Sequence, residues 1–194
     1  GTLTGYYYSF DQNISRFFLI GDSFPTSPFL EKESVSILEN EAGYDGQFFL
    51  TLGLDPLMNH HETMDGLDIP SYRSKRILLP ALANSLSFGK NDLVSYNIVG
   101  INAVSILLIF ILYSFYRGKW DGISLLSLAI PGLWLVLRIS TAEILANMLV
   151  LVSYLMITNN RNRFALISVG LACLAKETML IFAASYAVVY LVRR

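Results

Sequence analysis

The side chain best placed to do chemistry in this chain is a carboxylate set between glycines, Asp45, in the block from Gly43 to Gln47. Glycines let the backbone pass close to a ligand, and the dipole of a helix beginning at Asp45 would keep its carboxylate ionised. An ionised carboxylate at a boundary between water and membrane can take a proton from an acceptor hydroxyl. Asp is also a common helix cap, so the spacing equally fits a residue that only caps a helix.

A basic cluster follows, with Arg73, Lys75 and Arg76 within four positions. Arginine can hold two phosphate oxygens through parallel N–H groups, which suits an anionic headgroup. At the edge of an interfacial helix, the same cluster equally suits simple contact with lipid headgroups. The chemistry indicated is therefore anion binding, with two alternative partners.

Two later polar breaks interrupt apolar sequence, Arg138 with Glu143 and Lys176 with Glu177. The hydroxyl residues before Glu143 can cap a helix together with it, but capping leaves Arg138 unexplained. Ionisable groups at the depth of Lys176 and Glu177 are functional candidates, and an ion pair within or between helices is the alternative.

Metal and thiol chemistry are not favoured. His60 and His61 are adjacent, and neighbouring helical positions point apart, so solvated loop histidines are favoured over a shared metal. Cys173 lies in an apolar stretch and is expected to be a buried structural thiol. No metal site and no firm cofactor is predicted, although a divalent metal is compatible with the acidic residues.

The composition is typical of a membrane protein. Hydrophobic residues make up 54% of the chain, charged residues 15%, and the mean hydropathy is +0.50. The formal net charge of -1 argues against a nucleic-acid partner. Membrane lipids are therefore the expected surroundings.

Between Leu93 and Arg194, the turns between apolar stretches differ in the charges they carry. Purely basic clusters stand at alternate ends of the apolar stretches, namely Arg117 with Lys119, Arg161 with Arg163, and Arg193 with Arg194. Because cationic loops stay on the cytoplasmic side, the mixed acid and base pairs at Arg138 and Lys176 are expected together on the opposite face.

Four or five membrane crossings are expected after Asn91. The stretches are Leu93 to Tyr116, Gly122 to Leu137, Glu143 to Thr158 and Phe164 to Val192. The last is expected to be two short helices meeting at Lys176, because a Lys or a Glu at mid-bilayer costs roughly 2.5 to 3.5 kcal/mol on insertion scales. The predicted fold is all-α, a polytopic membrane helical bundle over residues 92–194.

Residues 1–91 are expected to form an extracytoplasmic first loop that carries interfacial amphipathic helices. One helix is predicted within Tyr44 to Leu57 and another within Ser71 to Phe88. The apolar core of the second is about a dozen residues, which is too short to span a bilayer, so it is placed in the interface.

Three blocks carry a resemblance to a known family: Tyr44 to Phe49, Leu54 to Pro56, and Tyr72 to Pro80. They resemble bacterial membrane proteins of cell-surface glycopolymer formation, which are similar to the GT-C superfamily of integral-membrane glycosyltransferases. The resemblance runs from about Tyr6 to the end. It implies transfer of a sugar from a polyprenyl-phosphate donor to a glycan or lipid acceptor, at the extracytoplasmic face of a bacterial inner (plasma) membrane.

The resemblance also implies roles for residues of this chain. Asp45 would be the catalytic base or orient the acceptor, and Glu143 would be the second acid. The residues implied to meet the carrier's phosphate are Lys176, Arg73, Arg76 and Arg138. Supporting positions are Tyr44, Gln47 and Glu177.

GT-C proteins have a membrane helix ahead of the external loop and usually more helices than this chain, so a fragment of a longer protein is expected. The competing class is a non-enzymatic flippase or assembly subunit that binds a lipid-linked glycan without transforming it. A transporter with broken helices is less favoured, because the polar segment before Asn91 is longer than a simple transporter loop requires.

Overall fold

The computed structural model describes residues 13–23, 26–32 and 35–192. These residues are mostly helical, and the strands among them are a parallel pair of two residues each, β1 (Ile20–Gly21) and β2 (Ile37–Leu38). The all-α prediction is confirmed at this level. The basic residues Arg193 and Arg194 and the start of the resemblance at Tyr6 lie outside the described residues.

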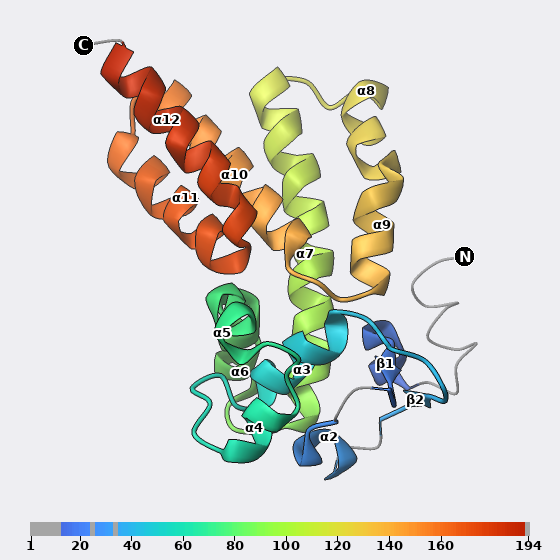
Figure 1. Ribbon diagram of the computed structural model, residues 1–194. Helices are drawn as coiled ribbons and strands as arrows, with labels where there is room; N and C mark the ends of the chain where they lie inside the picture. Colours follow the sequence, from blue (N-terminus) through green and yellow to red (C-terminus); the bar gives the residue numbers. More distant parts are fainter. Residues whose placement is uncertain (1–12, 24–25, 33–34, 193–194) are drawn as a thin grey trace.

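The N-terminal part is built from short elements around the lower end of α7 (Figure 1). They are η1 (Ile14–Phe18), α2 (Pro28–Lys32), α3 (Gly46–Leu54), α4 (His61–Asp65), α5 (Pro70–Arg73), η2 (Ser74–Arg76) and α6 (Leu78–Ser87). Helix α3 lies within the stretch predicted from Tyr44 and ends before Pro56, which cannot continue it.

The single helix predicted from Ser71 to Phe88 is wrong in part, because the structure divides it into α5, η2 and α6. Pro80 has no backbone N–H, so an unbroken α-helix would leave the Arg76 carbonyl without its partner. The chain instead starts a new helix at Leu78, which places Pro80 in the first turn, where the missing N–H does no harm.

Residue 92 begins a series of helices that run alternately up and down in Figure 1. They are α7 (Asp92–Arg117), the broken segment α8 (Gly122–Leu125), η3 (Leu126–Ala129) and α9 (Pro131–Arg138), then α10 (Glu143–Thr158), α11 (Asn162–Ala175), η4 (Glu177–Met179) and α12 (Leu180–Val192). The predicted break at Lys176 is present, and a second break directly precedes Pro131. The stretch from Phe164 is thus two helices that meet near Lys176.

Helix α7 has 26 residues and is long and apolar enough to cross a membrane, since it contains an 18-residue stretch with a mean hydropathy of 2.4, of which 33% is buried. Among the described helices it alone meets this test, since α10 has 16 residues and α11 has 14. The structure therefore holds one candidate span by length and composition, and the four or five crossings stay a prediction.

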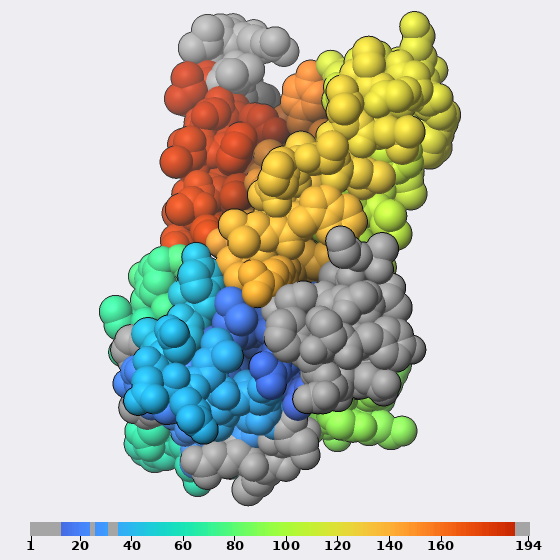
Figure 2. Space-filling view, turned by 90° about the vertical axis from the view of Figure 1, so that its right-hand side faces the viewer, coloured from blue at the N-terminus to red at the C-terminus, as the bar shows by residue number. Residues whose placement is uncertain are grey.

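One hydrophobic core joins the N-terminal part to the later helices. It contains Phe18 of η1, Phe49 of α3 and Ile98 of α7 together with Ala146 of α10 and Ala175 of α11. Figure 2 shows the lower end of α9 meeting the N-terminal elements, where it contacts η1. This core packs α3 against α11 and the turn after it, and α11 also contacts η2.

Candidate functional site

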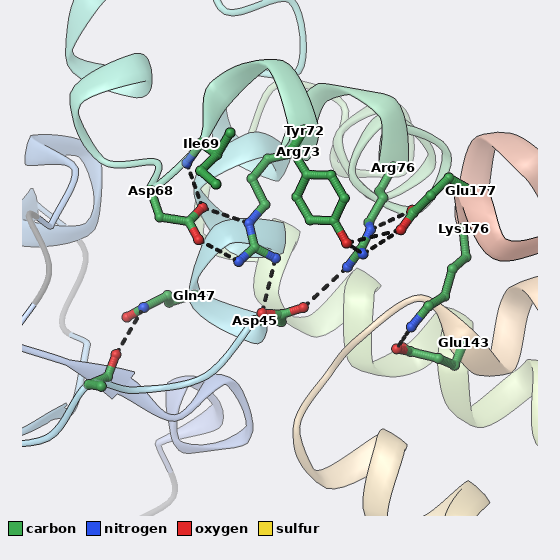
Figure 3. A network of polar contacts seen from close by, with 11 residues as sticks. Asp45, Gln47, Asp68, Ile69, Tyr72, Arg73, Arg76, Glu143, Lys176 and Glu177 are labelled. Atoms are coloured by element: carbon green, nitrogen blue, oxygen red, sulfur yellow. Dashed lines mark hydrogen bonds and ion pairs between the residues drawn. The ribbon is translucent and has the colours of Figure 1, made fainter.

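Asp45 occupies the N-cap position of α3, but its side chain makes no capping hydrogen bond to the described backbone of that helix. Its carboxylate instead faces two arginines (Figure 3). Oδ1 lies 3.0 Å from Nη1 of Arg73, and Oδ2 accepts a hydrogen bond from Nη1 of Arg76 at 3.2 Å. The capping interpretation of Asp45 is therefore wrong for this structure.

Arg73 is buried and is held on its other side by Asp68. Its Nε and Nη2 donate to the two Asp68 oxygens at 2.7 and 2.8 Å, and its guanidinium lies 4.2 Å from the centre of the Phe48 ring. The hydrogen bond from Arg73 lowers the pKa of the Asp68 carboxyl. Burial alone would lower the pKa of Arg73, but the hydrogen bonds to Asp68 and the negative charges of Asp68 and Asp45 outweigh it and raise that pKa. Both groups therefore stay charged near neutral pH.

Arg76 is buried and forms the matching pair with Glu177. Nε donates to Oε2 at 2.7 Å and Nη2 donates to Oε1 at 2.6 Å. The Tyr72 hydroxyl donates to the same Oε1 at 3.0 Å, Arg76 Nη2 contacts that hydroxyl, and the guanidinium lies 4.4 Å from the centre of the Tyr72 ring. Figure 3 thus shows an alternating row, here called the carboxylate–arginine row, of Asp68, Arg73, Asp45, Arg76 and Glu177.

The local structure explains why both arginines face Asp45. Arg73 ends α5 and Arg76 ends η2, so they stand three positions apart across a 3-10 turn. Side chains at positions i and i+3 eclipse each other in a 3-10 helix and therefore point the same way. Pro70 starts α5 and the break at Ile77 ends η2, which aims this short segment at the start of α3.

Glu143 and Lys176 form a second, separate ion pair beside the row (Figure 3). Glu143 is the first residue of α10, and Asn102 of α7 fixes the preceding loop by donating to the Thr141 carbonyl at 3.0 Å. Lys176 therefore pairs across helices with Glu143, and Glu177 pairs with Arg76. The interhelical ion pair, one alternative for this polar break, is the arrangement present.

Glu143 is also not part of a capping box. The N-cap position is Ala142, which makes no side-chain cap within the described part of α10. Glu143 Oε1 faces Lys176, whereas Oε2 is buried and has no hydrogen-bond partner among the described residues. The second acid expected at the site therefore keeps one acceptor oxygen unused.

Gln47, which was expected to support the site, does not contact the carboxylate–arginine row. Its Oε1 accepts from the Gly21 backbone N–H at 3.1 Å, and its Nε2 donates to the Ala42 carbonyl at 3.3 Å. Figure 3 shows the side chain directed away from Asp45. Gln47 thus braces the loop before α3 against β1.

Tyr44 and Arg138 also lie away from the expected positions. The Tyr44 side chain is exposed, and its backbone N–H donates to the Leu19 carbonyl at 2.9 Å. Arg138 is exposed at the end of α9 and is not one of the five residues of the carboxylate–arginine row. The structure therefore brings together six of the nine predicted site residues, namely Asp45, Arg73, Arg76, Glu143, Lys176 and Glu177.

The glycines beside Asp45 pack against protein backbone, which corrects the expectation that they open space for a ligand. A Cβ on Gly46 would lie 2.4 Å from the Ile139 carbonyl oxygen and 2.7 Å from that of Phe18. Gly43 has a φ of +71°, a conformation that favours glycine. Gly46 lets the loop before α10 pass directly over the start of α3, and Gly43 lies against Gly21 of β1 and the Leu19 carbonyl.

Sequence reasoning missed Asp68 and Tyr72 as members of the cluster. A signal for Tyr72 was available, because Tyr72 and Arg76 are four positions apart and would share a helix face. Asp68 lies five positions before Arg73, beyond helical pairing distance, and only the turn at Pro70 brings the two together.

The histidines lie away from the carboxylate–arginine row, at the start of α4, where His60 is the N-cap and His61 the first residue. Asp55 accepts hydrogen bonds from the His60 backbone N–H at 3.0 Å and from the Thr63 hydroxyl at 2.7 Å. Burial by itself would raise the pKa of Asp55, but these hydrogen bonds outweigh it and lower that pKa. His60 is 58% exposed, and the described residues hold no group of three or more His, Cys, Asp or Glu side chains placed for a metal ion. Cys173 is half-buried and packs against the main core.

Comparison with protein-family models, with curated proteins and with solved structures found no match to this chain. Function must therefore be inferred from the arrangement of the side chains themselves.

Proposed function

We propose that this chain is part of a membrane glycosyltransferase that moves a sugar from a polyprenyl-phosphate donor to a cell-surface glycan or lipid acceptor. The observation that carries the proposal is the convergence of Asp45, from the first loop, with cations from distant segments. Arg76 contacts both Asp45 and Glu177, and Lys176 lies beside Glu177 with its own partner Glu143. Among them, Asp45 is the residue that the resemblance to the GT-C superfamily assigns as base, and Arg76 and Lys176 are residues that it assigns to phosphate binding.

A polytopic arrangement in the membrane is supported by the surfaces of the later helices. Large apolar side chains are exposed on α9, α11 and α12, among them Leu135, Phe164, Leu166, Ile167, Leu180, Ile181 and Phe182. None of the described side chains of α12 is buried. Exposed apolar area on this scale is unfavourable in water and favourable in lipid.

The contact between α10 and α11 has the character of packing in a membrane. The Ser153 hydroxyl donates to the Ala165 carbonyl at 2.8 Å, and the Ser168 hydroxyl donates to the Leu149 carbonyl at 2.7 Å. Hydroxyl groups that bond across two apolar helices are a common device of membrane bundles, where water cannot satisfy them.

The lengths of α10 and α11 indicate the depth in the membrane at which the carboxylate–arginine row and the Glu143–Lys176 pair, together called the cluster, would lie. At a rise of 1.5 Å per residue, α10 and α11 reach about 24 and 21 Å, short of the roughly 30 Å of a typical hydrocarbon core. The turn at Lys176 would then lie at the rim of the bilayer, where local thinning and water access lower the cost of its charge.

The direction of the helices supports a common external face for the cluster. Figure 1 shows the end of α7 and the turn between α10 and α11 at the top, whereas the turns before α10 and after α11 lie next to the N-terminal part. The upper ends carry the cations Arg117, Lys119, Arg161 and Arg163. By the positive-inside rule, the cluster would lie on the extracytoplasmic side.

In the proposed reaction, the acceptor oxygen attacks the anomeric carbon while the bond from that carbon to the phosphate oxygen breaks. Asp45 takes the acceptor's proton, and the leaving polyprenyl phosphate keeps the electron pair of the broken bond. Arg73, Arg76 and Lys176 stabilise its negative charge. Attack from the face opposite the phosphate inverts the anomeric configuration.

The test is sugar transfer by the protein reconstituted in liposomes with a polyprenyl-phosphate-linked sugar and a glycan acceptor. The Asp45→Asn variant should insert normally and lose transfer, because an amide cannot take the proton. Asp65→Asn removes the same charge from the exposed surface of α4 and should transfer normally. Wild-type transfer by Asp45→Asn removes Asp45 from the mechanism.

One observation favours the non-enzymatic alternative, a flippase or assembly subunit. Each Asp45 oxygen contacts a buried arginine, so in this state the carboxylate is a counter-ion rather than a base facing a substrate. Lipid-phosphate binding with no sugar transfer by the wild-type protein in the same liposomes would favour this alternative.

A further inference from the structure

The two arginines of the carboxylate–arginine row use their nitrogens in the same way. In each, Nε and Nη2 form the two-point contact to one carboxylate, Asp68 for Arg73 and Glu177 for Arg76. The remaining nitrogen, Nη1, points at Asp45 in both. Two buried guanidinium groups therefore aim their remaining donors at one place.

The three carboxylates are not held equally. Asp68 and Glu177 each bind through two hydrogen bonds of 2.6 to 2.8 Å, whereas Asp45 makes single contacts of 3.0 and 3.2 Å. The Asp45 side chain is 35% exposed, against 24% for Asp68 and 27% for Glu177. Of the three carboxylates, Asp45 can therefore leave the row with the smallest loss of interaction energy.

The contact between Asp45 and Arg73 is also incomplete. The two atoms are at ion-pair distance, yet Arg73 Nη1 is buried and has no partner with hydrogen-bond geometry among the described residues. A buried N–H group without a good acceptor is costly. An oxyanion with tetrahedral oxygens has more directions in which to accept from the two Nη1 atoms than one planar carboxylate has.

We infer that Arg73 and Arg76 form an oxyanion site whose resident ligand is Asp45, and that a phosphate group exchanges with Asp45 on the two Nη1 atoms. The inference deepens the proposed function, because it rests on these arginines meeting the donor's phosphate. Arrival of that phosphate releases the Asp45 carboxylate, and the base becomes available only when the donor is bound.

Charge makes the exchange obligatory. The row holds three carboxylates and two guanidinium groups, a formal excess of one negative charge. The Lys176 and Glu143 pair beside it adds no net charge. A phosphate placed next to all three carboxylates would be repelled, so the phosphate and Asp45 cannot occupy the two Nη1 atoms together, and Asp45 turns away as the phosphate takes its place.

The test is equilibrium binding to the detergent-solubilised protein, measured by calorimetry with farnesyl phosphate and with inorganic phosphate as probes. Asp45→Asn should bind phosphate at least about tenfold more tightly than wild type, because a neutral amide competes less well for the arginines and does not repel the probe. Asp65→Asn is the matched control and should bind like wild type. Tighter binding of farnesyl phosphate than of inorganic phosphate assigns the site to a lipid headgroup, and equal binding assigns it to a free phosphate group.

Binding by Asp45→Asn that is equal to or weaker than wild-type binding overturns the inference, provided that its thermal unfolding midpoint is unchanged. If that variant does not fold, Asp45→Ser removes the same charge with a smaller side chain. The wild type gives a measurement that needs no variant, since it must take up farnesyl phosphate in preference to farnesol, and equal uptake overturns the inference. Because the readout is binding, a failure of sugar transfer leaves this result intact.

Discussion

Arg76 and Glu177, which are 101 positions apart in the sequence, form a two-point ion pair with N–O distances of 2.6 and 2.7 Å. The pair joins η2 of the N-terminal part to η4, the turn between α11 and α12. Tyr72 supports it through a hydrogen bond to the same carboxylate. This one contact therefore ties the segment that aims both arginines at Asp45 to the turn that carries Lys176.

Replacing Glu177 with Gln should destabilise the protein by about 1–3 kcal/mol, since the two-point contact of the buried Arg76 is then made to a neutral group and only its single contact to Asp45 stays charged. The partial exposure of Glu177 keeps the loss below that of a fully buried pair. The measurement is chemical denaturation of the purified protein in detergent. The control, Glu62→Gln in α4, removes an exposed carboxylate and should change the free energy of unfolding by less than about 0.5 kcal/mol. Equal stability of the two variants would show that the ion pair does not hold the two parts together.

The elements of this pair could be predicted from sequence, but the pair itself could not. Hydropathy and the insertion cost of Lys176 are local properties, and they predicted α7 and the break between α11 and α12. The choice of Arg76 rather than Lys176 as the partner of Glu177 depends on how α11 packs, through Ala172 and Ala175, against the rest of the core. Tertiary packing of small residues leaves no periodic signal that would identify the partner.

The contacts of Asp45 could not be predicted from sequence either. Its position at the start of a helix was predicted, and capping is the local interaction that such a position favours. Two buried arginines from a later segment are stronger electrostatic partners than backbone N–H groups. The Asp45 carboxylate therefore contacts these arginines instead of capping the helix.

A methyl group on Gly46 should disturb the site without touching any charged residue. Gly46→Ala would place its Cβ 2.4 Å from the Ile139 carbonyl oxygen, so the loop before α10 must move. We expect a loss of about 1–3 kcal/mol in the free energy of unfolding.

Gly170→Ala in α11 is the matched control, because nothing lies within 4 Å of a Cβ at that position. Alanine is a better helix former than glycine, so this variant should gain up to about 1 kcal/mol. Thermal unfolding measures the change in stability of both variants. A similar loss of stability in both would show that the close contact at Gly46 does not cause the loss.

Acid should destabilise the loop around Asp55. Hydrogen bonds to the carboxylate hold the folded-state pKa of Asp55 below its ordinary value of 3.8, which we take for the unfolded chain. The resulting stabilisation is therefore fully present above the unfolded pKa and is lost as pH falls through the lower folded pKa. Asp55→Asn should be less stable than wild type at pH 7 by about 1–3 kcal/mol, since the backbone N–H groups of Asn59 and His60 and the Thr63 hydroxyl lose a charged acceptor.

The measurement for Asp55 is the difference in unfolding free energy between wild type and Asp55→Asn as a function of pH. That difference should be constant near neutral pH and should shrink below about pH 4 as the wild-type carboxyl becomes protonated. A difference that grows on acidification would have the wrong sign for a lowered pKa.

Side-specific labelling tests whether the cluster and the basic turns lie on opposite faces of a membrane. With Cys173 replaced by Ala, single cysteines at Ser71 and at Asn159 are both exposed, the first beside the carboxylate–arginine row and the second in the turn between α10 and α11. Added to intact cells, a membrane-impermeant maleimide should label Ser71→Cys and leave Asn159→Cys unlabelled until the membrane is opened. This result requires at least one membrane crossing between the two positions. Helix α7 lies between them and is long and apolar enough to make that crossing alone. Labelling of both in intact cells would place the cationic turn outside, against the positive-inside rule, and would remove the membrane boundary that the proposed site needs.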